Sequence, residues 1–137
     1  MIFDPSGNLY GATEIGGSGS GGTVFKLTPA GNGNWTYTLI YSFTATGENC
    51  GPGWTLAMDS AGNLYGTTTC DGVNHAGSVF KLTPSGGNWT YTSLHDFTGG
   101  DGYNPQCSVV FDARGNLYGT TSSGGAYNYG VVWEITP

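Results

Sequence analysis

Three aspartates occupy the same position of a repeated motif and are the first side chains to test for chemistry. Asp4, Asp59 and Asp112 each precede a short turn that ends in Gly-Asn-Leu-Tyr. Recurring carboxylates raise calcium binding as one interpretation, but the motif lacks the alternating oxygen ligands of a calcium loop. An Asp at the start of a glycine-containing turn can instead accept backbone N–H groups. We therefore expect these aspartates to cap turns, and the sequence predicts no metal site.

The acidic and histidine residues also do not form a pattern that is typical of a catalytic site. Glu48 and Asp101 share a position before a predicted strand, but acids related by a repeat spread along an array. Glycoside hydrolysis needs two acids that converge at about 5–9.5 Å. His75, a predicted loop residue, and His95, at an aromatic position of the repeat, show no zinc-ligand spacing. Neither has the G-x-S-x-G partner of a serine hydrolase. The sequence predicts a protein that is not an enzyme, with no catalytic residue and no cofactor.

The three cysteines predict one disulfide. Cys50 and Cys70 are almost equidistant from the centre of a predicted hairpin near residues 60–61. They would therefore lie opposite each other, within the about 4.4–6.8 Å between Cα atoms that a disulfide requires. Cys107 occupies the position of Trp54 in the repeat, and we expect it to pack as a small apolar residue.

Several aromatic and asparagine side chains are candidates for stacking on sugars or for carrying a glycan. Two sequons begin at Asn34 and Asn88, each at the start of a predicted outer strand, and are candidate glycosylation sites. The alternative is that they only encode turns before Trp-Thr strands. Aromatic residues that could stack on glycans are Trp35, Trp89, Tyr37 and Tyr91 in strands and Tyr127 and Tyr129 in a loop. The regular alternation of the strand residues favours packing between sheets.

The composition limits the protein class. The 137 residues include 26 glycines, 9% charged and 14% aromatic residues. Disordered chains have few aromatics and high charge, and glycine disfavours helices by about 1 kcal/mol per position. No apolar run approaches the roughly 18 residues of a membrane span. The net charge is −6, with Lys26, Lys81 and Arg114 scattered. Nucleic acids and membranes are therefore poor partners, and an all-β extracellular protein is expected.

Internal repeats determine the predicted architecture. The motif Gly-Asn-Leu-Tyr-Gly begins at Gly7, Gly62 and Gly115, and a second motif of the type Gly-Thr-Val-Phe-Lys-Leu-Thr-Pro begins at Gly22, Gly77 and Gly130. Both recur 55 and then 53 residues later. Each period contains four short strand patterns joined by glycine-rich turns. A repeated antiparallel four-stranded unit of about 50 residues favours a blade of a β-propeller.

Two details of the predicted strands can be checked directly. The third strand of each unit is expected to stop at Pro29 or Pro84, because proline cannot donate to a ladder. The fourth strand alternates apolar and polar residues. The alternation predicts one apolar face made of Trp35, Tyr37, Leu39, Tyr41 and Phe43.

The repeated motifs resemble a known family. The Gly-Asn-Leu-Tyr-Gly-Thr-Thr block at residues 62–68, the glycine-rich loops and the Gly-Thr-Val-Phe-Lys-Leu block at residues 22–27 are similar to the GloVer-type tandem repeat of secreted bacterial proteins. The first half of each unit also resembles NHL and SMP-30-like propeller blades. The resemblance implies a propeller-like extracellular array of many copies and assigns no catalytic residue.

The number of strands predicts an incomplete array. Blade 1 is expected over about residues 1–46, blade 2 over 52–100 and blade 3 over 105–137, the last without its outer strand. Propellers use about four to eight blades, so both flanks should expose apolar surface. The third blade should leave an open edge at Val131, Val132, Trp133 and Ile135.

Three interpretations of this incomplete array stay open. Several copies of the chain could close an oligomeric ring, or they could form a filament. Alternatively, the chain could be a piece of a longer array. The leading functional hypothesis is a non-enzymatic extracellular scaffold that completes its fold by self-association. The alternative is a carbohydrate-binding, lectin-like propeller.

Overall fold

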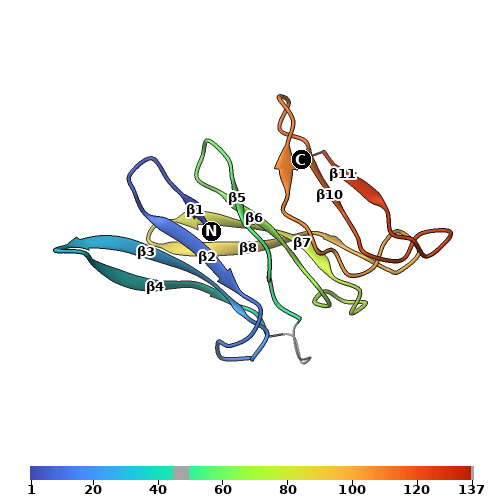
Figure 1. Ribbon diagram of the computed structural model, residues 1–137, viewed down its shortest axis with the longest axis horizontal. Coiled ribbons are helices and arrows are strands. Elements are labelled where there is room, and N and C mark those ends of the chain that lie inside the picture. The colour runs from blue at the N-terminus through green and yellow to red at the C-terminus, as the bar shows by residue number, and fades with distance from the viewer. Residues whose placement is uncertain (45–49, 137) are drawn as a thin grey trace.

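The computed structural model describes residues 1–44 and 50–136, which form eleven strands in three separate antiparallel sheets (Figure 1). No helix occurs in these residues, so the predicted all-β class is confirmed. The three sheets follow one another from the N-terminal to the C-terminal end and do not close a ring. The described part of the chain holds no helix long and apolar enough to cross a membrane.

Each sheet is a meander in which consecutive strands pair. Sheet 1 contains β1 (Ile2–Phe3), β2 (Leu9–Thr13), β3 (Thr23–Gly31) and β4 (Asn34–Ser42). Sheet 2 contains β5 (Ala57–Met58), β6 (Leu64–Thr68), β7 (Ser78–Ser85) and β8 (Asn88–Asp96). Sheet 3 contains β9 (Val110–Phe111), β10 (Leu117–Thr120) and β11 (Val132–Ile135). Equivalent strands thus carry equivalent motifs, and in the described residues only sheet 3 has three strands.

The prediction that proline ends the third strand of a unit is wrong. β3 and β7 continue through their prolines, with Pro29 opposite Trp35 and Pro84 opposite Trp89. β2 pairs with β3 only as far as Leu27. Beyond that point β3 has a neighbour on one side, and a strand edge of this kind tolerates proline.

The prediction of a single apolar face on the fourth strand is also wrong. Phe25 lies opposite Leu39, but the adjacent Val24 lies opposite Tyr41, so Ile40 is an extra residue in β4. Such a bulge moves the residues after it to the other face of the sheet. Trp35, Tyr37 and Leu39 therefore share one face, whereas Tyr41 faces the opposite way. β8 has the same register shift.

Two hydrophobic cores lie between neighbouring sheets. Core 1 joins Tyr10, Val24 and Phe43 from sheet 1 and its border to residues of sheet 2 such as Phe80 and Leu82. Core 2 joins the other side of sheet 2 to sheet 3 and contains Tyr65, Val79, Phe97, Leu117 and Trp133. Sheet 2 is consequently covered on both faces, whereas sheets 1 and 3 each bury one.

Candidate functional site

The three predicted aspartate turns have nearly the same geometry. One oxygen of Asp59, Oδ1, accepts the backbone N–H groups of Ala61 and Asn63, both at 2.9 Å. The other, Oδ2, accepts Asn63 Nδ2 at 2.7 Å and the Tyr65 hydroxyl at 2.9 Å. Gly62 closes the turn with a φ of +82°, a conformation that glycine adopts without strain. Asp4 and Asp112 accept the matching four bonds in their own turns.

The hydrogen bonds of these turns shift the pKa values of the aspartates and of the tyrosines bonded to them. Burial raises the pKa of Asp59, but the bonds from Asn63, Tyr65 and Ala61 together outweigh it, so the net pKa lies below its ordinary 3.8. Burial, followed by the bond to Asp59, raises the pKa of Tyr65 to about 12. Tyr10 beside Asp4 is shifted to about 12 for the same two reasons. Each pair is therefore a carboxylate and a protonated phenol at neutral pH.

The aspartates act as turn caps, as the sequence predicts. Each carboxylate already accepts four internal hydrogen bonds, which account for its usual lone-pair positions. Among residues 1–44 and 50–136, no three His, Cys, Asp or Glu side chains gather in a way that could hold a metal ion.

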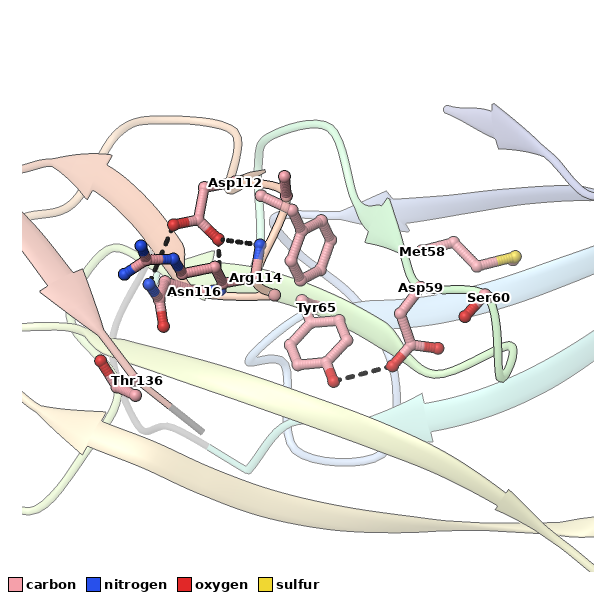
Figure 2. A pocket seen from close by; sticks show the side chains of 11 residues that line it. Met58, Asp59, Ser60, Tyr65, Asp112, Arg114, Asn116 and Thr136 are labelled. Carbon is pink, nitrogen blue, oxygen red and sulfur yellow. Dashed lines mark hydrogen bonds between the residues drawn. The ribbon is translucent and has the colours of Figure 1, made fainter.

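A groove of about 590 Å³ separates two of these turns, one from sheet 2 and one from sheet 3 (Figure 2). Asp59 and Ser60 line one side, and Asp112 and Arg114 line the other, with the Tyr65 ring between them. The lining contains hydroxyls, aromatic rings and one guanidinium but no histidine or cysteine. A smaller hollow of about 340 Å³ separates the turns of sheets 1 and 2. The recurrence indicates that the gap comes from the packing of successive sheets.

Of the described acidic and histidine residues considered for catalysis, His95 and Asp101 form an exposed pair and His75 lies apart in a loop. Asp101 accepts the backbone N–H of Thr98 at 2.7 Å and pairs with His95 Nε2 at 2.9 Å. Both side chains of this pair are about two-fifths exposed. His75 is an exposed loop residue with a φ of +53°, and Glu48 lies outside the described residues.

Cys50 and Cys70 form a disulfide, the pair predicted from the hairpin, with their Cα atoms 4.6 Å apart. The bond joins the segment before β5 to the end of β6. The repeat positions in sheet 3 are Tyr103 and Ser123, which form an antiparallel bridge with reciprocal backbone bonds of 2.8 and 3.2 Å. The Cys50–Cys70 disulfide indicates a non-reducing setting, since disulfides persist outside reducing compartments. The half-buried Cys107 packs against core 2, and its Sγ accepts the Thr120 N–H at 3.2 Å.

The residues predicted to contact sugars fall into two groups. Tyr127 and Tyr129 are 84% and 90% exposed on the loop before β11. This loop is held by backbone bonds and by Asn128 Oδ1, which accepts the Gly124 N–H at 2.9 Å. Asn34 and Asn88 are exposed at the first residues of β4 and β8. Their glycosylation stays a prediction.

Equivalent strand aromatics have different surroundings in sheets 1 and 2. Tyr91 stacks on Tyr41 with ring centroids 4.8 Å apart, and Trp89 meets Tyr10 edge-to-face at 6.3 Å. Tyr37 is the counterpart of Tyr91 and is 56% exposed. In the described chain its ring contacts one other ring, that of Phe25 in the same sheet. The packing between sheets that was predicted for the strand aromatics is therefore confirmed for Trp89 and Tyr91 in sheet 2. Their counterparts Trp35 and Tyr37 in sheet 1 lie on the surface instead.

This surface is the front face of sheet 1, formed by Phe3, Phe25, Trp35, Tyr37 and Leu39. Four of their counterparts in sheet 2 help to build core 1, namely Met58, Phe80, Trp89 and Tyr91, and Phe80 is fully buried. The counterpart of Leu39 is the exposed Ser93. Sequence reasoning predicted exposed flanks and named Trp35 and Tyr37 as possible sugar contacts, but it did not identify Phe3, Phe25 and Leu39 as part of this surface. The available signal was the repeat itself, since Phe25, Trp35 and Tyr37 have the same residue types as their covered counterparts in the second copy.

The opposite end of the molecule exposes the back face of sheet 3, formed by Val110, Tyr118 and Val132. Val132 is 79% exposed, whereas its counterparts Val24 and Val79 are fully buried. Of the residues predicted at the open edge, Val132 is thus on the surface and Val131 is half-buried. Trp133 and Ile135 point into core 2 and pack against sheet 2.

Comparison with known proteins agrees with the repeat pattern. No curated protein and no solved structure matches the chain. The family model described as the Gloeobacter/Verrucomicrobia repeat matches residues 1–137, in line with the tandem motifs and the three related sheets. The chain therefore belongs to the Gloeobacter/Verrucomicrobia repeat family.

Proposed function

We propose that this chain is a non-enzymatic extracellular structural protein that associates head to tail with further sheets of the same repeat. One observation carries the proposal: the front face of sheet 1 and the back face of sheet 3 leave apolar residues such as Phe25 and Val132 in contact with water, whereas their counterparts Phe80 and Val79 are fully buried between sheets. Contiguous apolar surface of this kind marks interaction sites. Because the two faces differ, the contact is heterologous and leads either to a closed propeller-like ring or to a filament.

The contact between sheets 1 and 2 supplies a template for the proposed contact. Trp35 would approach Tyr118 of the neighbouring array as Trp89 approaches Tyr10 within the chain. Val132 would be covered by the front face, as Val24 is covered by sheet 2. The neighbouring array can be a second copy or further repeats of a longer chain, because both present the same chemistry.

Two single variants test this contact. Tyr37→Asp places a charge on the front face and Val132→Asp places one on the back face, both at exposed positions where folding is little affected. Light scattering should show assemblies for the parent chain at high micromolar concentration and monomers for either variant alone. A mixture of the two variants should form dimers and nothing larger, since each retains one intact face. Thr36→Asp, at an exposed position on the other side of β4, is the matched control and should assemble normally.

Two outcomes would contradict the proposal. One is a parent chain that stays monomeric up to millimolar concentration. The other is a mixture of the two variants that behaves as the separate monomers do, because a heterologous contact requires the intact faces to pair.

A lectin-like function is the second candidate, favoured by the exposed Tyr127 and Tyr129 on a hydrogen-bonded loop. Exposed rings on a loop that is held by hydrogen bonds suit stacking on sugars. Binding on a glycan array that is lost in both Tyr127→Ala and Tyr129→Ala would support this candidate. An array without hits would remove it.

A further inference from the structure

The surroundings of Tyr91 provide a reference for a vacant position elsewhere in the molecule. Its ring stacks on Tyr41 at 4.8 Å, meets Phe43 edge-to-face at 5.9 Å and lies 6.2 Å from Phe80. Tyr91 belongs to β8, the outer strand of sheet 2, and lies opposite Leu82. A tyrosine of an outer strand is thus enclosed by three rings, two of them contributed by the preceding sheet and its border.

The counterparts of these three rings line a hollow between sheets 2 and 3. The repeat relates Tyr41 to His95, Phe43 to Phe97 and Phe80 to Trp133. A hollow of about 240 Å³, here called the outer hollow, is lined by His95, Phe97 and Trp133 together with Asp101, Glu134 and Ile135. In the described chain, no ring occupies it as Tyr91 occupies its own site.

The walls of the outer hollow already have the geometry that Tyr91 meets. His95 and Phe97 are edge-to-face, with centroids 4.7 Å apart and an interplanar angle of 82°. The reference pair, Tyr41 and Phe43, has 4.9 Å and 79°. Asp101 holds the His95 ring through the 2.9 Å contact. A site arranged in advance loses little free energy to reorganisation when it binds.

Two further features of sheet 3 lie beside the outer hollow. The outer edges of β3 and β7 are covered by β4 and β8, whereas no strand in the described residues pairs with the outer edge of β11. A free strand edge offers main-chain donors and acceptors to another segment. Trp133 Nε1 is also buried and has no hydrogen-bond partner in the described chain.

We propose that the β11 edge and the outer hollow form a binding site for an extended polypeptide segment of the Trp-Thr-Tyr-Thr type. The segment pairs antiparallel with β11, and its tyrosine enters the outer hollow opposite Ile135, as Tyr91 lies opposite Leu82. Main-chain bonds supply affinity and the ring supplies selectivity, as in other cases of strand addition. This site lies apart from the two end faces, so it goes beyond the proposed assembly and is tested separately.

The first test uses a synthetic peptide with the sequence of residues 87–96 and the full chain carrying Tyr37→Asp, which keeps face-to-face assembly out of the measurement. Calorimetry should show saturable binding of one peptide per chain. A peptide with alanine at the tyrosine position should bind at least about tenfold more weakly, since it loses a buried ring and its aromatic contacts. A peptide with alanine at the preceding threonine is the matched control and should bind within about twofold. Equal binding of the tyrosine and alanine peptides would overturn the proposal.

Variants of the chain test the same site from the other side. His95→Ala should lower the affinity for the peptide by about fivefold or more. His95→Tyr places in the outer hollow the ring type that Tyr41 provides beside Tyr91, and this variant should bind the peptide at least as tightly as the parent. Tyr127→Ala, on an exposed loop, is the control and should leave binding unchanged.

A tethered form keeps the test decisive if the free peptide does not bind measurably. A chain extended after residue 137 by a flexible linker and the residues 85–97 sequence should melt several degrees above the same chain with alanine at the tyrosine position. Identical melting of these two chains, together with no binding of the free peptide, would refute the site.

Discussion

Sheets 1 and 2 have nearly the same motifs but different surroundings. Phe25 and Phe80 begin the same Phe-Lys-Leu-Thr-Pro sequence, yet Phe25 is half-buried and Phe80 is fully buried in core 1. In both sheets the ring covers a glycine, Gly11 or Gly66, at which an added Cβ would collide with it. The local structure is therefore the same, and the difference in burial comes from a preceding sheet, which covers sheet 2 and which sheet 1 lacks in the described chain.

The largest expected effect separates these two phenylalanines. Phe80→Ala should lower the free energy of unfolding by about 4 kcal/mol, because it removes a buried ring and leaves a cavity. Phe25→Ala should cost about 1 kcal/mol, since its ring already contacts water. Urea denaturation at low protein concentration measures both. Equal losses would show that the front face of sheet 1 is not an open surface.

The same two phenylalanine variants also test the proposed association between arrays. If front faces are covered by neighbouring arrays, the cost of Phe25→Ala should rise as the protein concentration increases, because the association stabilises only the folded state. The cost of Phe80→Ala should stay constant.

A second comparison concerns the disulfide of sheet 2 and the hydrogen-bonded bridge at the same position of sheet 3. Replacing Cys50 and Cys70 together by serine should cost about 3 kcal/mol, since the bond closes a loop of about 20 residues in the unfolded chain. Thermal unfolding with and without reductant measures this loss. Reductant should destabilise the parent chain and leave the double variant unaffected. Cys107→Ser, which leaves the disulfide in place, is the control and should show a smaller loss.

The smallest effect distinguishes the aspartate turns of sheets 2 and 3. Asp59→Asn should cost about 2 kcal/mol at pH 7, because charge-assisted hydrogen bonds to the partly buried Tyr65 turn are weakened. Asp112→Asn makes the same change in the more exposed turn and should cost less. Unfolding of both variants and the parent in urea gives the comparison.

The pH dependence of these turns follows from the lowered pKa of Asp59. Its stabilisation is fully present above the unfolded value near 3.8 and is lost as the pH falls through the lower folded value. The stability gap between the parent and Asp59→Asn should therefore narrow as the pH falls below about 4. A gap that does not narrow between pH 4 and pH 2 would show that the charge of Asp59 is not the source of the stabilisation.

Local features of this chain could be predicted from the sequence. The Asp59 turn depends on residues within six positions, and the Cys50–Cys70 pair depends on one hairpin. The repeated motifs also predicted the strands and their order. The direction of Tyr41 could not be predicted, because the bulge at Ile40 becomes visible only in the pairing of β3 with β4. The continuation of β3 through Pro29 depends likewise on which side of the strand has a neighbour.

The sequence by itself determined the all-β class, the tandem motifs, the turns and the disulfide, because each depends on short-range contacts or on the repeat. Only the tertiary structure decided which copies of the same motif are buried. Val24 and Val79 are covered and Val132 is exposed, although the three occupy the same position of the repeat. Burial depends on the neighbouring sheet, so the same residue type becomes core where two sheets meet and stays on the surface at the outer face of an end sheet.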